Sequence, residues 1–187
     1  ISGVDQALWD IKGKRAGMPV YQLLGGKCRE AAACYAHAGG SCREEVVDSI
    51  RAFMEEGYRH IRVQLGGYGG LSSALTRPDG AQDGAYFDPR GYVRAHLKLF
   101  EYVREQVGDE VELLHDIHER LTPIDAVGFA GDAERFKLFF LEDPLAPEDL
   151  EWFHHIRQQC STPIAMGELF NHPREWQPLI AGRLIDF

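Results

Sequence analysis

Three acidic residues, Asp116, Glu142 and Glu168, each follow a short apolar run and could together bind a metal ion. Their spacing is regular, since 26 residues separate Asp116 from Glu142 and another 26 separate Glu142 from Glu168. An interval of this length is about one strand, loop, helix and loop, so the three acids take the same place in successive units. If the strands are parallel, the three side chains meet at the carboxyl ends of neighbouring strands.

Carboxylates that converge at one edge of a sheet repel one another unless a cation lies among them. Oxygen ligands completed by water suit Mg²⁺, so the spacing predicts a magnesium site. The alternative is that three unrelated polar residues end three strands, and the equal spacing disfavours it. The neighbouring acids Glu119 and Asp143 are expected to be supporting or surface charges rather than ligands.

The chain around these acids alternates between apolar, strand-like runs and amphipathic, helix-like stretches. The pattern predicts strands over residues 31–38, 60–65, 112–118, 138–142 and 163–168, and helices over residues 43–56, 89–107, 122–136, 149–159 and 173–181. Pro89 and Gly108 mark the start and the end of the second of these helices. Residues 66–87 are rich in glycine and predict a long loop, and residues 184–187 resemble the beginning of another strand.

Strands connected by helices of this length pair in parallel through right-handed crossovers, so the predicted fold class is α/β. The run Leu138-Phe139-Phe140-Leu141 is apolar on both faces, as in a parallel strand that is covered by helices. This pattern by itself allows either a doubly wound sheet or an eight-stranded (β/α) barrel. The three acids favour the barrel, because barrel enzymes build their active sites at the carboxyl ends of the strands.

The composition is that of an ordinary globular protein, with 44% hydrophobic and 26% charged residues among 187. No apolar run approaches the roughly 20 residues needed to span a bilayer, so we expect no membrane partner. The net charge of −9 argues against a nucleic-acid partner, but not against a small anionic substrate that a metal ion helps to hold. The four cysteines match no zinc or redox spacing and predict free thiols in a reducing cytoplasm.

Several ordered segments resemble the mandelate racemase branch of the enolase superfamily, most nearly its mannonate dehydratase and starvation-sensing subgroup. The resemblance covers essentially the whole chain, and it rests on residues 3–26, 35–37, 61–64, 114–123, 141–144 and 167–171. It implies a TIM-type (β/α) barrel, incomplete here, together with part of the capping-domain helix. Residues 1–26 would end the N-terminal capping domain, and residues 27–187 would hold barrel strands one to five and the start of the sixth. The chain would accordingly be cut at both ends.

The resemblance also implies a reaction, in which a proton next to a carboxylate is removed and water is lost to give a 2-keto-3-deoxy sugar acid. Asp116, Glu142 and Glu168 correspond to the Mg²⁺ ligands, in agreement with their spacing. His118 corresponds to the general acid that helps the hydroxyl to leave, and histidine side chains titrate near neutral pH. It lies two residues after Asp116, so an extended backbone would point both side chains the same way; a surface histidine is the alternative. His115 would point to the opposite face and be structural.

The base that removes the proton is not expected to be a lysine. The second predicted strand ends in Arg62-Val63-Gln64, without the Lys-x-Lys pattern of lysine-dependent racemases and cycloisomerases. In the dehydratases that the chain resembles, an arginine in the place of Arg62 acts beside a loop tyrosine and lowers its pKa. That tyrosine would fall near Leu75, where this chain has none, so Tyr68 is the candidate base and Tyr86 is also nearby. This departure bears on mannonate as the substrate more than on the metal site.

Three further residues are candidates for substrate binding. His37 corresponds to a substrate-contacting histidine of the subgroup, with a histidine hydrogen-bonded inside the barrel as the alternative. Arg120 and Asn171 could bind substrate hydroxyl groups or orient the acids.

The predicted function is therefore that of a Mg²⁺-dependent acid-sugar dehydratase similar to mannonate dehydratase. One alternative is a dehydratase or epimerase for another sugar acid, such as gluconate. The other is a catalytically weak paralogue that binds a sugar acid or has a regulatory role. The resemblance further implies a homo-oligomer whose partner is a small sugar acid.

Overall fold

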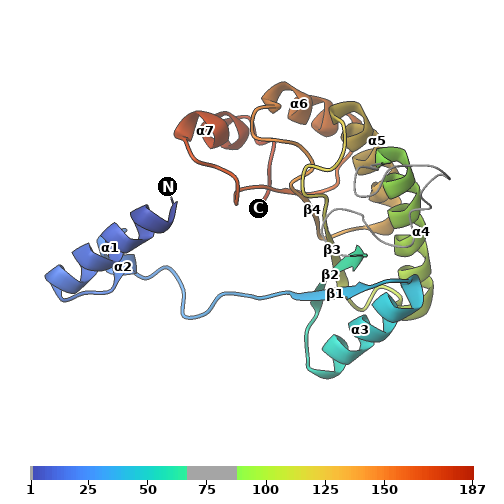
Figure 1. The fold of residues 1–187 in the computed structure, drawn as a ribbon, viewed down its shortest axis with the longest axis horizontal. Helices are drawn as coiled ribbons and strands as arrows, with labels where there is room; N and C mark the ends of the chain where they lie inside the picture. The colour runs from blue at the N-terminus through green and yellow to red at the C-terminus, as the bar shows by residue number, and fades with distance from the viewer. Residues whose placement is uncertain (1, 67–87) are drawn as a thin grey trace, which may run out of the picture. The chain divides into compact units, whose positions relative to one another are not determined.

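Figure 1 shows the protein as a computed structural model, which describes residues 2–66 and 88–187. The chain divides into two compact units, Ile1–Cys34 and Tyr35–Phe187. The candidate base Tyr68 lies outside the described residues, as do Leu75, Tyr86 and nearly all of the predicted loop. The other candidate site residues all belong to the second unit.

The first unit contains two helices, α1 (Ser2–Ala16) and α2 (Val20–Leu23). Helix α1 ends before Gly17, whose φ of 64° lies in the left-handed region that glycine adopts readily. Pro19 precedes α2, where its fixed φ suits the entry into a helix. No candidate site residue lies in this unit, so the site is described from the second unit alone.

The second unit is built on a five-stranded parallel sheet in which each strand pairs with the next one along the chain. Its strands are β1 (Ala36–Gly40), β2 (His60–Leu65), β3 (Glu112–Asp116), β4 (Phe140–Glu142) and β5 (Ile164–Ala165). Its helices are α3 (Arg43–Glu55), α4 (Pro89–Val107), α5 (Pro123–Ala133), the 3-10 turn η1 (Glu134–Phe136), α6 (Leu150–Gln159) and α7 (Pro173–Ala181) (Figure 1). Sequential strand order is that of a barrel wall, whereas a doubly wound sheet reverses its order at a switch point. The α/β prediction is confirmed, and the sheet agrees with an incomplete barrel.

Four predicted strands have different bounds in the structure, and the one predicted over residues 138–142 begins at Phe140. The first begins at Ala36 rather than at residue 31, because residues 31–34 are exposed and belong to the first unit. The strand predicted over residues 112–118 ends at Asp116, where the backbone turns. The one predicted over residues 163–168 is reduced to β5.

The last residues of the chain lie beside β5 without forming an assigned strand. The backbone N–H groups of Asp186 and Phe187 donate to the carbonyl of Ile164, and Met166 donates to the carbonyl of Phe187. The sequence pattern of a beginning strand therefore corresponds to real backbone pairing at this edge of the sheet.

Helices α4 and α5 begin with the same local chemistry. Asp88 accepts a hydrogen bond from the backbone N–H of Gly91 at 2.8 Å, and Thr122 accepts one from Asp125 at 3.4 Å. Each cap residue is followed by a proline at the first helical position, where its missing N–H is not needed.

Among the described helices, none combines the length and the apolar composition needed to cross a membrane.

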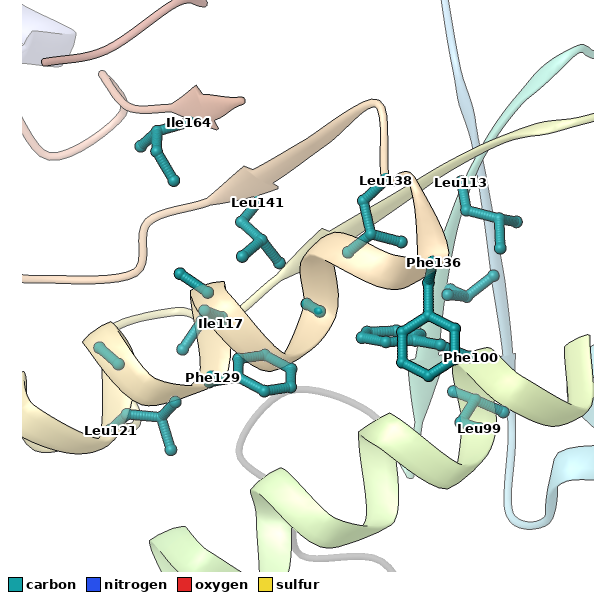
Figure 2. Packing of buried hydrophobic residues seen from close by; sticks show 14 of the residues in the cluster. Leu99, Phe100, Leu113, Ile117, Leu121, Phe129, Phe136, Leu138, Leu141 and Ile164 are labelled. Atoms are coloured by element: carbon teal, nitrogen blue, oxygen red, sulfur yellow. The ribbon is translucent and has the colours of Figure 1, made fainter. Parts of the chain in front are cut away.

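The main hydrophobic core lies between the sheet and the helices. On β2, Ile61 and Val63 are fully buried in this core. Figure 2 shows Phe100 of α4, Phe129 of α5 and Leu141 of β4 within it, and the rings of Phe100 and Phe129 stack at 6.0 Å between centroids. This packing fixes the helices against one face of the strands.

A smaller cluster lies on the other face of the sheet. Leu114, Phe140 and Ala165 come from three neighbouring strands, and Tyr35 and Phe139 pack against them. Because side chains alternate along a strand, this face also carries the residues two positions away, which include the candidate ligands Asp116 and Glu142.

Helix α4 buries a histidine, His96, beneath the sheet. Its Nδ1 lies 3.0 Å from the carbonyl oxygen of Tyr92, and its Nε2 accepts the backbone N–H of Leu65 at 3.5 Å. This pattern suits a neutral ring that donates from one nitrogen and accepts at the other. Burial lowers the pKa of His96 to about 4, because a charged ring would lose its solvation.

Acid should therefore destabilise the fold through His96. Its folded pKa of about 4 lies below the ordinary value of 6.5, so between pH 6.5 and pH 4 the unfolded chain binds a proton that the folded chain does not. We expect His96 to contribute about 2 kcal/mol of lost stability between pH 7 and pH 4.5. Urea unfolding at both pH values should show a smaller loss for His96→Gln than for the wild type or for the exposed-site control His154→Gln. An equal loss in all three proteins would contradict the prediction.

Candidate active site

The sheet register places two of the three predicted ligands side by side. Asp116 on β3 pairs with Glu142 on β4, and both stand at the carboxyl ends of their strands. Asp116 is 3% exposed, whereas Glu142 is partly buried. Glu168 follows β5 by three residues, and its side chain is 53% exposed.

A buried arginine joins Asp116 to a histidine on β1. The Nη1 atom of Arg62 donates to Oδ2 of Asp116 at 2.7 Å, and its Nη2 atom lies 3.1 Å from Nδ1 of His37. The side chains of Arg62 and Asp116 are only 6% and 4% exposed, so their ion pair is shielded from water. The pKa of His37 is lowered by burial and by the charge of Arg62, which favours a neutral ring.

His118 reaches the acids by a different backbone path from the one predicted. The expectation of an extended backbone was wrong, because His118 and Glu119 have φ angles of 57° and 56° in the left-handed region. The chain leaves β3 here, and the N–H of Glu119 donates to the carbonyl of Asp143, the residue after β4, at 3.0 Å. The backbone N–H of His118 also donates to Oδ1 of Asp116 at 3.0 Å.

This turn places the imidazole between two predicted ligands. Nε2 of His118 lies 3.7 Å from Oδ2 of Asp116 and 3.6 Å from Oε1 of Glu168. The structure thus brings Asp116, Glu168, His118, Arg62 and His37 into one continuous set of polar contacts.

Tyr35 also contacts this set, which the sequence did not indicate. Its hydroxyl donates to Oε2 of Glu142 at 3.3 Å, and its ring stacks on His37 with 5.2 Å between centroids. Burial and the charge of Glu142 raise the pKa of Tyr35 to about 12. At neutral pH this phenol keeps its proton, so it is a hydrogen-bond donor rather than a base. The available signal was its position two residues before His37, on the same side of an extended chain.

Four carboxyl groups at this end of the sheet carry raised pKa values, those of Asp116, Glu119, Glu142 and Asp143. Burial raises the pKa of Asp116, although His118 and Arg62 oppose the shift, and burial and then the charge of Asp116 raise the pKa of Glu142. The pKa of Asp143 rises to about 7, again from burial and then from Asp116 and other acids. Burial and then Glu148 raise that of Glu119. A bound cation would relieve this repulsion and favour the ionised forms.

Several buried oxygens beside the acids are also unsatisfied. Both carboxyl oxygens of Asp143, Oε1 of Glu119 and Oε1 of Gln64 have no hydrogen-bond partner within the described part of the chain. Gln64 was not among the predicted site residues, although it stands two positions after Arg62 on β2. Buried polar atoms without partners are uncommon in proteins and point to a missing ligand, ion or water.

The carboxylate oxygens of Asp116, Glu142 and Glu168 are of the type that Mg²⁺ prefers, although the three side chains do not surround one point. Over residues 2–66 and 88–187, no three His, Cys, Asp or Glu side chains lie close enough together to hold a metal ion. Asp116 is turned toward Arg62 and His118, and Glu142 toward Tyr35. The ligand assignment therefore stays a prediction.

His115 has the structural role that its place on β3 predicted. Its ring is fully buried, with Nδ1 2.8 Å from the carbonyl oxygen of Val63 and Nε2 2.8 Å from the hydroxyl of Tyr92. Burial lowers its pKa well below the ordinary value, so the ring is neutral. These bonds tie β3 to β2 and to α4 directly beneath Asp116.

The two remaining substrate-binding candidates lie in the segments that follow β3 and β5. Arg120 is half-buried in the turn after β3, and its backbone N–H donates to the carbonyl of Ile117 at 3.2 Å. Asn171 is exposed and bonded within its own loop, its amide donating to the carbonyl of Leu169 at 2.8 Å. No contact in the structure tests their role toward a substrate.

Comparison with known proteins identifies the class. The profile of the enolase C-terminal domain-like family matches residues 45–187, and that of the mandelate racemase / muconate lactonizing enzyme N-terminal domain matches residues 1–25. The chain therefore belongs to the enolase superfamily, in its mandelate racemase and muconate lactonizing enzyme branch.

Particular relatives are similar over the whole chain. D-galactonate dehydratase family members from Enterocloster bolteae and Pantoea ananatis are each 52% identical over 100% of this chain, which covers 47% and 49% of their own lengths. A crystal structure of an enolase from Pantoea ananatis with bound D-gluconate and Mg is 51% identical, with a TM-score of 0.86 over 98% of this chain and 48% of that one. The chain thus spans about half the length of the relatives it matches.

Proposed function

We propose that the protein containing this chain is a Mg²⁺-dependent dehydratase of sugar acids. The observation that carries the proposal is the contact of His118 with both Asp116 and Glu168, beside the buried pair of Asp116 and Arg62. The dehydratase-family relatives support it, as does the similar structure that holds D-gluconate and Mg.

Asp116, Glu142 and Glu168 would hold the ion. Mg²⁺, when bound, supplies positive charge that stabilises the negative charge developing on the substrate carboxylate as the adjacent proton leaves. Arg62 adds a fixed positive charge at the same place, since its guanidinium stays protonated at any working pH. His37, which contacts Arg62, would contact the substrate, and Arg120 and Asn171 are further candidates for its hydroxyl groups.

His118 would donate a proton to the departing hydroxyl. Its Nε2 lies within 4 Å of both Asp116 and Glu168, at the place where the proposed ion would hold the substrate. Arg62 is too basic to take the substrate proton itself, so we retain Tyr68 as the candidate base. A Tyr68→Phe variant that keeps full turnover would remove that assignment.

The product distinguishes some of the candidate sugar acids but not all of them. D-mannonate and D-gluconate differ only in configuration at C2, which becomes a carbonyl carbon when water is lost, so both give the same 2-keto-3-deoxy acid. D-galactonate gives a product that differs at C4. Each acid must therefore be supplied separately, and the product alone does not reveal which of the first two was used.

The test is a panel of sugar acids assayed for 2-keto-3-deoxy product with the full-length protein. We expect turnover of at least one of D-gluconate, D-mannonate and D-galactonate with Mg²⁺, and loss of turnover when the metal is chelated. Binding of a sugar acid without any turnover would favour the catalytically weak paralogue. A size measurement in solution would test the expected homo-oligomer, which rests on the resemblance alone.

A further inference from the structure

We propose that Tyr35 is a positioning residue that holds the ligand candidate Glu142 with its hydroxyl and the substrate-contact candidate His37 with its ring. This inference rests on the proposed function, because it gives Tyr35 a role in assembling that same site. Tyr35 is not one of the residues that the sequence pattern assigned to ligation, proton transfer or substrate binding.

The backbone explains why Tyr35 can reach both partners. It is the residue immediately before β1, and Ala36, the first residue of that strand, is buried. Side chains alternate along an extended chain, so Tyr35 and His37 project from the same side of β1. Their rings stack with an interplanar angle of 23°.

The tyrosine ring also packs against the face of the sheet that carries Asp116 and Glu142. It packs against the cluster of Leu114, Phe140 and Ala165, and it meets the Phe140 ring edge-on at 6.0 Å between centroids. Phe140 and Glu142 are both on β4, on the same face of the sheet. Packing of the Tyr35 ring on Phe140 therefore places the Tyr35 hydroxyl within hydrogen-bond distance of Glu142, which lies 107 residues further along the chain.

The hydroxyl of Tyr35 engages one oxygen of Glu142 and restrains its rotation. Among the hydrogen bonds of the described residues, Oε2 of Glu142 is used by Tyr35 and Oε1 accepts none. Carboxylates that bind metal ions are commonly fixed in this way by an outer hydrogen-bond donor, whose loss weakens metal binding about 10- to 100-fold. The ring separately supports His37, whose Nδ1 lies 3.1 Å from Nη2 of Arg62.

Two substitutions separate these roles. Tyr35→Phe removes the hydroxyl and keeps the stacked ring, so in the full-length protein we expect the Mg²⁺ dissociation constant to rise about 10-fold. The KM for the sugar acid at saturating Mg²⁺ should change by less than about twofold, because His37 stays supported. Tyr35→Leu removes ring and hydroxyl together, so both the Mg²⁺ dissociation constant and that KM should rise, each by about 5- to 10-fold.

A matched control is Tyr58→Phe, since Tyr58 packs edge-on against Phe53 in the helix-side core, away from the site. It should leave Mg²⁺ binding and KM unchanged. Mg²⁺ affinity is measured by calorimetric titration, and thermal unfolding without metal reports on the fold. If Tyr35→Leu does not fold, Tyr35→Phe decides the question, because it retains the ring packing.

The outcomes separate this inference from the proposed function. A Tyr35→Phe protein that unfolds at a lower temperature but binds Mg²⁺ like the wild type would show a merely structural role and overturn the inference. If the wild type turns over sugar acids with Mg²⁺ and Tyr35→Phe has the same Mg²⁺ affinity and turnover, the inference is overturned and the proposed function stands. A wild type that binds no Mg²⁺ would overturn the proposed function and this inference with it.

Discussion

Glu168→Gln is expected to weaken Mg²⁺ binding on the order of 100-fold and to lower kcat/KM on the order of 1,000-fold. The substitution removes one of three negative charges and leaves the size of the side chain unchanged. Because Glu168 is more than half exposed, the free energy of unfolding should change by less than about 0.5 kcal/mol. Calorimetric titration with Mg²⁺ and steady-state turnover of the accepted sugar acid measure the two effects.

The matched control is Glu151→Gln, an acid on the exposed side of α6. It removes the same charge at a distance from the site and should leave both quantities at wild-type values. Unchanged Mg²⁺ affinity in Glu168→Gln would remove Glu168 from the ligand set. Equal losses in both variants would attribute the effect to net charge rather than to ligation.

His118→Asn is expected to lower kcat by about 100- to 10,000-fold while the Mg²⁺ affinity changes by less than about threefold. The imidazole lies 3.7 Å from Asp116 and 3.6 Å from Glu168, where it can deliver a proton to a substrate bound at the ion that those acids would hold. Asparagine keeps a hydrogen-bonding group of similar size but cannot transfer a proton. Turnover is measured at saturating substrate and Mg²⁺, with the exposed His154→Asn as the control.

Isotope exchange identifies which step His118 serves. If it assists only the departure of the hydroxyl, His118→Asn should still exchange the C2 hydrogen of the substrate with deuterium from D₂O, as followed by NMR. If exchange of the C2 hydrogen falls by the same factor as turnover, His118 would instead be assigned to proton removal. Wild-type turnover in His118→Asn would exclude it from the chemistry altogether.

Some features of the protein followed from sequence because they depend on neighbouring residues. The bounds of α4 were predicted correctly, since Pro89 and Gly108 act at the very positions where a helix begins and ends. The regular interval between Asp116 and Glu142 predicted their adjacent places on β3 and β4, because one crossover unit has a nearly constant length. Short ordered segments of the sequence likewise predicted the membership of the enolase superfamily.

The turn after β3 was not predictable in the same way. Two consecutive residues, His118 and Glu119, take left-handed backbone angles that neither favours by itself. Backbone groups there bond to the end of β4 and to the residue after it, with Ile117 donating to Glu142 and Glu119 to Asp143. Local propensity favoured a continued strand, and the tertiary pairing overrode it.

The sequence by itself determined the α/β class, the adjacent places of Asp116 and Glu142, and the family. Strand period, helix signals and the length of one crossover unit are local properties of the chain. Only the tertiary structure decided which side chains meet. Arg62 pairs with Asp116 across 54 residues, and Tyr35 with Glu142 across 107. Such contacts depend on how the strands pair and on which rotamers the buried charged side chains adopt. The spacing of residue types along the chain predicts neither of these.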